Sequence, residues 1–125
     1  RSNTKDYLDR HLAICAKIRK PLVMEEFGFP RDDFQFALGT PTKGRDSFYE
    51  YVFSLVNDNA AQGGYFAGCN FWGWGGLAQP KHAEQWQVGD DYTGDPAQEA
   101  QGLYSVFAGD ASTLQVIRTQ IERMK

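Results

Sequence analysis

A short apolar run that ends in two carboxylates is the feature of this sequence that most constrains its fold. Residues 20–32 read KPLVMEEFGFPRD, and the apolar part, residues 22–24, is too short for a helix. Glu25 and Glu26 follow directly, where an ordinary buried strand would continue with apolar residues. In α/β proteins ligands bind outside the carboxyl ends of parallel strands, so acidic residues placed there indicate chemistry. We therefore predict a buried strand over residues 21–29 with a functional site at its carboxyl end.

A second segment of similar character lies further along the chain. Residues 64–76 read GYFAGCNFWGWGG, and this apolar stretch predicts a strand over residues 65–72. Helical spacing of apolar residues predicts one helix before each strand and one after the second. Strands that alternate with helices imply an α/β fold with parallel pairing. The predicted order is a helix up to Lys20, the first strand, a loop over 30–44, a helix over 45–62, the second strand, a long connection over 73–109, and a last helix from about Ser112, where Ser112 and Gln115 form a capping-box pair.

Two parallel strands make a poor sheet, because both outer edges lack a hydrogen-bonding partner. The sequence shows no third convincing strand, so the simplest interpretation is one piece of a larger parallel sheet or barrel. The chain begins without an initiator Met, and we expect it to be cut from something larger. We predict that the piece associates through its unpaired strand edges or packs against further sequence of the parent protein.

Composition excludes several classes of function. Hydrophobic residues make up 42% of the chain, which is typical of a globular protein. The net charge is −3 and no Lys- or Arg-rich run occurs, so we predict no nucleic-acid partner. No run of apolar residues is long enough to predict a membrane-spanning segment. Cys15 and Cys69 are predicted to be buried free thiols, and no spacing of Cys and His residues predicts a metal site or a cofactor.

Alternation of side chains along the first strand separates the two glutamates. On strict alternation Glu26 shares a face with Met24, and Glu25 shares the opposite face with Phe27. If Glu26 points into the mouth of a barrel, Trp72 on the neighbouring strand can form a wall beside it. A carboxylate beside an aromatic platform suits a sugar, because the carboxylate can attack or stabilise an oxocarbenium-like centre while the indole stacks on the ring.

The same residues also have purely structural interpretations. Either glutamate can form an ion pair with Arg31 or Lys43, and for Glu25 we favour this interpretation. Trp72 and Trp74 can be ordinary core residues, as aromatic side chains often are.

The long connection carries two further candidate features. Trp86 and Tyr92 can form an outer sugar subsite, or they can be the hydrophobic anchors that hold the loop down. Asp90, Asp91 and Asp95 resemble a weak cation-binding cluster, but their spacing lacks the calcium-loop pattern. We expect a solvated acidic loop there.

Both strand segments carry motifs of a known family. The stretch KPLVMEEFGFPRD resembles the seventh strand of the family 5 glycoside hydrolases, in which the nucleophile is the Glu directly before an aromatic residue and a Gly. By this resemblance the nucleophile is Glu26. GCNFWGWGG resembles the eighth strand, whose Trp beneath the sugar corresponds to Trp72, and we take Trp74 as a second substrate-binding residue. The tail over residues 86–113 resembles the closing loop of family 5 endo-β-mannanases.

The resemblance implies that residues 1–125 form the C-terminal part of a (β/α)8 (TIM) barrel, with its last two βα units. The parent protein is then a retaining endo-1,4-β-mannanase that acts on β-mannan, without a cofactor, outside the cell or in the periplasm. A retaining mechanism needs two carboxyl groups about 5–5.5 Å apart, and the family's Asn-Glu acid/base pair on strand four does not occur in this sequence. Glu25 cannot replace it, because it neighbours Glu26. The chain alone is therefore expected to be inactive.

Competing interpretations remain open at this point. The parent can be another barrel glycosidase, such as a cellulase. The chain can be a non-catalytic carbohydrate-binding module that uses Trp72, Trp74 and Trp86, or a purely structural interaction piece with exposed strand edges. A dinucleotide-binding unit is disfavoured, because no G-x-G-x-x-G follows the first strand.

Overall fold

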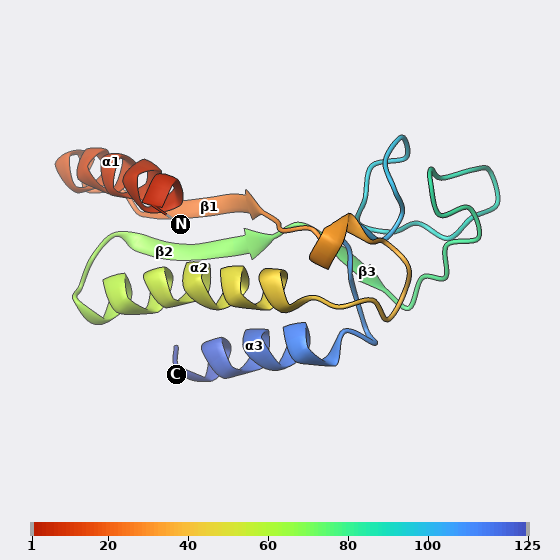
Figure 1. The fold of residues 1–125 in the computed structure, drawn as a ribbon. Helices are drawn as coiled ribbons and strands as arrows, with labels where there is room; N and C mark the ends of the chain where they lie inside the picture. The colour runs from red at the N-terminus through yellow and green to blue at the C-terminus, as the bar shows by residue number, and fades with distance from the viewer. Residues whose placement is uncertain (1, 125) are drawn as a thin grey trace.

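The fold consists of three α-helices, two pairs of parallel strands and long loops (Figure 1). A computed structural model describes residues 2–124. Its elements, in chain order, are α1 (Ser2–Ile18), β1 (Leu22–Phe27), the 3₁₀ helix η1 (Asp32–Phe34), α2 (Lys43–Ala61), β2 (Phe66–Phe71), β3 (Trp74–Gly76), β4 (Val106–Phe107) and α3 (Ala111–Glu122). The main elements follow the predicted order, and the short strands β3 and β4 lie within the predicted long connection. Within the described residues, no helix combines the length and the apolar composition needed to cross a membrane.

The predicted parallel pairing of the two main strands is confirmed. β1 pairs with β2 in parallel, with Leu22 opposite Phe66 and Phe27 opposite Phe71. Residues 2–124 supply no further strand to this sheet, so the outer edges of both strands are unpaired. β3 and β4 form a separate parallel pair beyond the carboxyl ends of β1 and β2.

An irregularity in the register corrects the predicted assignment of side chains to strand faces. Met24 lies opposite Cys69 and Phe27 lies opposite Phe71, so β1 advances three residues where β2 advances two. Phe27 consequently packs against the α2 core on the same side as Met24. The prediction that Glu26 shares a face with Met24 is therefore wrong. Glu26 precedes the buried Phe27 and is itself exposed, so its side chain is directed away from the core that Phe27 shares with the helices.

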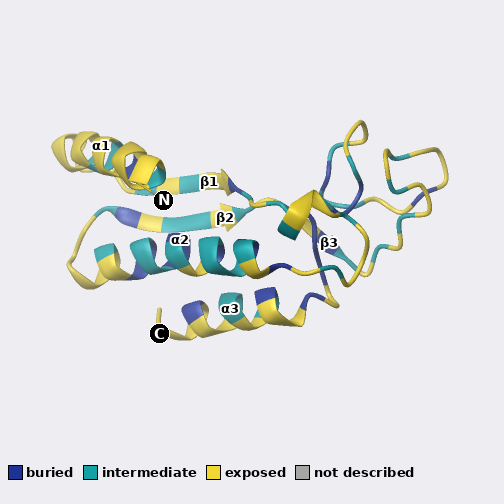
Figure 2. Ribbon diagram, in the orientation of Figure 1, coloured by how far each residue is buried: buried dark blue, intermediate teal, exposed yellow. Residues whose placement is uncertain are grey.

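The core lies between the sheet and the helices on one of its faces. Leu8 of α1 clusters with Val56 of α2 and Phe66 of β2, so both helices cover the same side of the sheet. A second cluster joins Phe27 to the α2 side chains, including Tyr49, which is fully buried. The sheet face opposite the helices is open, and its Val23 side chain is 49% exposed (Figure 2).

Helix α3 departs from its predicted pattern. It begins at Ala111 with Asp110 as the N-cap residue, so the predicted capping box that starts at Ser112 is wrong. Its buried positions, Thr113 and Gln120, are polar and bond to α2. Ile121 in α3 and Met124 just after it are 47% and 49% exposed, and they line a groove beside the free edge of β2.

Both cysteines carry free thiols, as predicted, but each is half-buried and not fully buried. Burial raises the pKa of the Cys69 thiol to about 11. At neutral pH Cys69 is therefore a protonated, poorly nucleophilic side chain packed against the α2 core.

Candidate active site at the carboxyl ends of β1 and β2

Glu26 lies one residue before the carboxyl end of β1, with an exposed side chain. Within residues 2–124, neither Glu25 nor Glu26 takes part in an ion pair or a side-chain hydrogen bond. The alternative that they pair with Arg31 or Lys43 is therefore wrong, and Arg31 binds a different carboxylate. A cleft along the free edge of β1 runs from α1 to Glu26. The carboxylate of Glu26 is thus available for chemistry and is not consumed by a structural contact.

The contacts of Phe27 and Gly28 explain why these two residue types follow Glu26. Phe27 is buried in the α2 core, and its carbonyl accepts a hydrogen bond from the Trp72 amide at 2.6 Å. A Cβ atom on Gly28 would lie 2.8 Å from the Trp72 carbonyl oxygen, so only glycine fits this close approach. The hydroxyl of Tyr49 donates to that same carbonyl at 3.3 Å. The Glu-Phe-Gly motif therefore anchors the end of β1 and brings the backbone of Trp72 against it.

The two predicted substrate-binding tryptophans both offer aromatic surface to solvent. The Trp72 side chain, directly after β2, is 40% exposed, and that of Trp74, on β3, is 56% exposed. The indole nitrogen of Trp74 lies against Gly76, 3.2 Å from the position that a Cβ atom would take there. Neither tryptophan belongs to the core clusters formed within residues 2–124. Exposed indole faces suit the apolar faces of a sugar ring.

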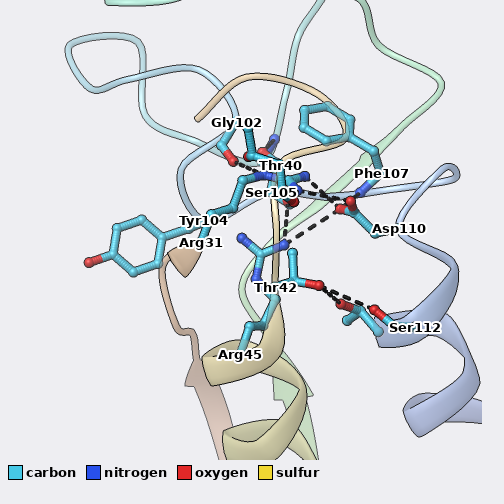
Figure 3. Close-up of polar contacts among 12 residues, drawn as sticks. Arg31, Thr40, Thr42, Arg45, Gly102, Tyr104, Ser105, Phe107, Asp110 and Ser112 are labelled. Carbon is cyan, nitrogen blue, oxygen red and sulfur yellow. Dashed lines mark hydrogen bonds and ion pairs between the residues drawn. The ribbon is translucent and has the colours of Figure 1, made fainter. Parts of the chain in front are cut away.

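A buried ionic cluster beneath this rim was not predicted from the sequence. Arg31 forms a bidentate pair with Asp110, with Nη1 at 2.9 Å from Oδ1 and Nη2 at 2.6 Å from Oδ2 (Figure 3). Two further N–H groups of Arg31 donate to the carbonyls of Gly102 at 2.9 Å and Thr40 at 3.0 Å. Arg31 is 1% exposed and Asp110 is 7% exposed, so the pair is isolated from water. It joins the loop after β1 to the start of α3.

A second arginine completes this cluster. Arg45 on α2 is fully buried and donates to the carbonyls of Phe29, Leu103 and Ser105 at 3.0, 2.8 and 2.9 Å. Burial lowers the pKa of Arg45, and the neighbouring charge of Arg31 lowers it further. The carbonyl dipoles and the shared Asp110 carboxylate, 3.5 Å from Arg45, offset the two positive charges.

Sequence signals for this cluster were weak. Arg45 lies on one helical face with Tyr49, Val52 and Val56, all of them buried, and that spacing marks it as an inward-facing position. No comparable signal exists for Arg31, because its partner Asp110 is 79 residues away in the sequence.

Asp95 fixes the loop that follows β3, contrary to the prediction of a solvated acidic loop. It is 7% exposed and accepts hydrogen bonds from the Tyr104 amide at 2.7 Å and from the Ser105 hydroxyl. The Ser105 oxygen accepts in turn from the Gly94 amide at 2.8 Å. A Cβ atom on Gly94 would lie 2.7 Å from the Gly73 carbonyl carbon, so this loop presses directly on the segment between the two tryptophans.

Asp90 is a second buried acid in the same connection. It is 8% exposed, and its carboxylate binds the His82 imidazole and the Gln87 amide at 3.0 Å each. Asp91 is exposed, and its carboxylate accepts from the Gln79 amide at 2.9 Å. In the part of the chain that is described, no group of three or more His, Cys, Asp or Glu side chains is arranged to hold a metal ion. The acidic residues here organise the loop itself.

Comparison with known proteins places this arrangement in a family. A family profile described as "GH family 5 beta-mannosidase-like" matches residues 1–125. A solved structure of a glycoside hydrolase family 5 mannosidase from Rhizomucor miehei is 31% identical, with a TM-score of 0.81 over 95% of this chain and 30% of that chain. A mutant of that enzyme in complex with mannosyl-fructose is 28% identical, with a TM-score of 0.82 over 98% of this chain and 31% of that chain.

A further mutant structure of the Rhizomucor miehei enzyme is 28% identical, with a TM-score of 0.78 over 99% of this chain and 33% of that chain. A search of curated proteins found no significant match. The chain therefore spans about a third of the length of the solved structures that it resembles. The profile match over the whole chain and the fold similarity agree, and the chain belongs to glycoside hydrolase family 5, with the beta-mannosidase-like members.

Proposed function

We propose that this chain is the C-terminal part of a (β/α)8 barrel enzyme, a retaining endo-glycanase that hydrolyses β-1,4-linked mannan with Glu26 as its nucleophile. The observation that carries the proposal is the position of Glu26. Its carboxylate lacks an ion-pair partner among the described residues and lies at the carboxyl end of β1, where the adjacent Phe27 carbonyl bonds the Trp72 amide. The parent enzyme is proposed to work outside the cell or in the periplasm.

The chemistry requires a second carboxyl group. In a retaining hydrolase one carboxylate attacks the anomeric carbon to form a covalent glycosyl-enzyme, while another acid protonates the leaving oxygen and later activates water. Glu25 is unsuited to the second role, because it directly neighbours Glu26 on the same strand, whereas the two carboxyl groups of a glycosidase flank the cleaved bond. The acid/base residue must come from outside this chain, so residues 1–125 alone are proposed to be inactive. Trp72 and Trp74 would stack on sugar units on either side of the cleaved bond.

The two neighbouring glutamates provide a matched test in the full-length protein. Glu26→Gln should lower kcat on β-1,4-mannan by about 10⁴-fold or more, because the nucleophile is lost. Glu25→Gln, one residue away and also exposed, should stay within about tenfold of the wild type. Proton NMR of the first-formed product should show the retained β-anomer. Substantial turnover by Glu26→Gln, or inversion of the anomer, would refute the mechanism.

Two separate measurements test which polysaccharide is the substrate and whether residues 1–125 are active on their own. Wild-type protein should release oligosaccharides from β-1,4-mannan faster than from cellulose, and the reverse order would favour a cellulase. Residues 1–125 alone should give no turnover on either polymer, and hydrolysis by the isolated chain that depends on Glu26 would overturn the requirement for an external acid.

A further inference from the structure

The loop over residues 77–101 projects beyond the carboxyl ends of β1 and β2, past the rim that carries Glu26 (Figure 1). It contains no regular helix or strand, yet its backbone is held at several points. The Trp86 amide donates to the Ala97 carbonyl at 2.9 Å, and the Gln101 amide donates to the Ala83 carbonyl at 2.7 Å. The loop is therefore a built scaffold, and a side chain on it has a defined position.

Two aromatic rings on this scaffold have different roles. Trp86 and Tyr92 stack with ring centroids 5.2 Å apart and planes inclined by 10°. Trp86 is half-buried, and its indole N–H donates to the Asp90 carbonyl at 3.2 Å. Asp90 is itself fixed by the Gln87 amide and the His82 ring. Trp86 is thus the anchor of the loop, with its polar group satisfied and one face covered.

Tyr92 is the open member of the pair. It is 81% exposed although one face of its ring lies on Trp86, so the other face is available to solvent. An aromatic ring that is exposed on one face and held in place by a stack on the other offers a fixed contact surface for a ligand with an apolar face. The ring is preorganised by the stack, which reduces the conformational entropy that a ligand must remove on binding.

We propose that Tyr92 forms a sugar-stacking platform outside the catalytic site, which binds a distant unit of an extended β-linked saccharide. The location supports a saccharide, because the loop follows β3, which begins at Trp74, and extends beyond the carboxyl ends of β1 and β2 (Figure 1). Asp91, which precedes Tyr92 in the sequence, is exposed and offers a polar group on the same loop, as suits a ligand with hydroxyl groups around an apolar face. The proposal rests on the proposed glycanase function and adds a specificity for chain length.

The test uses the full-length protein and β-1,4-manno-oligosaccharides of two to six units. Tyr92→Ala should raise KM for the longest substrates by about 3- to 10-fold, the size expected for one stacking contact. For the shortest substrates, which cannot reach the loop, kcat/KM should stay within about twofold. Tyr92→Phe should behave as the wild type, because the ring is kept. Val88→Ala serves as control, since Val88 is 94% exposed on the same loop and carries no ring.

Three outcomes would overturn the platform. Equal losses on short and long substrates, together with lower thermal stability, would mean that Tyr92 packs against another part of the parent protein. Unchanged kinetics at every length would mean that the ring contacts no substrate. An effect of Val88→Ala as large as that of Tyr92→Ala would point to the loop as a whole. Failure of the proposed function is separately visible, since the wild type would then hydrolyse none of these saccharides.

Discussion

The sheet of β1 and β2 and the loop region differ in how completely their backbone and side chains find partners within this chain. Among the described residues, no buried side-chain nitrogen or oxygen lacks a hydrogen-bond partner, and the loops reach this state through Arg31, Arg45, Asp95 and Asp110. The sheet of β1 and β2, in contrast, has two open edges and one uncovered face. The loop region that frames Glu26 is thus finished within this chain, whereas the sheet that carries Glu26 is built to continue.

The largest expected effect is a loss of stability on removing the charge of Asp110. It tests whether the loop region depends on its buried ionic cluster. Asp110→Asn in the full-length protein should lower the free energy of unfolding by about 3 kcal/mol or more, because it leaves two buried guanidinium groups without their anion. Urea unfolding measures the loss.

The matched control for that variant is Asp58→Asn, whose carboxylate pairs with Arg123 at 3.1 Å on the surface. It should change the stability by less than about 0.5 kcal/mol, since exposed pairs contribute little. If both variants had equal effects, the loop region would not depend on its buried cluster.

An effect of intermediate size is expected on self-association of the chain, because the sheet edges are open. Residues 1–125 alone should self-associate in sedimentation velocity at micromolar concentrations, because the unpaired edges of β1 and β2 favour pairing with another chain. Val23→Lys should weaken this association about tenfold or more, since it places a charge on the open face.

Val88→Lys provides the comparison on the loop side, where the side chain is 94% exposed and no sheet edge is involved. It should leave the sedimentation profile unchanged. A folded, strictly monomeric chain would contradict the view that the sheet is unfinished.

The smallest expected effect is a local change in the loop at low pH, when Asp90 becomes protonated. Burial alone would raise the pKa of Asp90, but hydrogen bonds from the Gln87 amide and the His82 ring outweigh it and hold that pKa below its usual range. The folded loop therefore favours the carboxylate. This stabilisation is present above about pH 4, the ordinary range of an aspartate, and is lost as the pH falls through the lowered folded-state pKa.

The measurement is the NMR signal of the Trp86 indole N–H, which donates to the Asp90 carbonyl. In an acid titration of the full-length protein it should shift before global unfolding. In Asp90→Asn the signal should be independent of pH over the same range. Identical titration curves in both proteins would show that Asp90 does not control the loop.

Local sequence patterns predicted much of the architecture, and the reasons are visible in particular residues. The apolar run before Glu25 is too short for anything but a strand, and the helical spacing around Val52 and Val56 required a buried face on α2. Gly63, with φ of 71°, ends α2 close to the predicted position. These signals depend on neighbours within a few residues, so the sequence carries them directly.

Sequence patterns gave wrong predictions where the orientation or burial of a side chain depends on contacts with another segment. Strict alternation placed Glu26 with Met24, but the register of β1 against β2 shifts Phe27 onto that side. The sequence predicted that the three aspartates of the connection lie in a solvated acidic loop. Two of them, Asp90 and Asp95, are instead buried and accept hydrogen bonds from backbone amides of their own loop.

The sequence by itself determined that Glu26 ends a strand, that an aromatic residue and a glycine follow it, and that the chain belongs with the family 5 glycoside hydrolases. The tertiary structure alone decided why those followers are needed: Phe27 fills the α2 core, and Gly28 lets the Trp72 carbonyl approach. It alone also paired Arg31 with Asp110, at opposite ends of the chain. The physical reason is that burial and hydrogen bonding act between surfaces brought together by folding, and a linear sequence does not state which surfaces will meet.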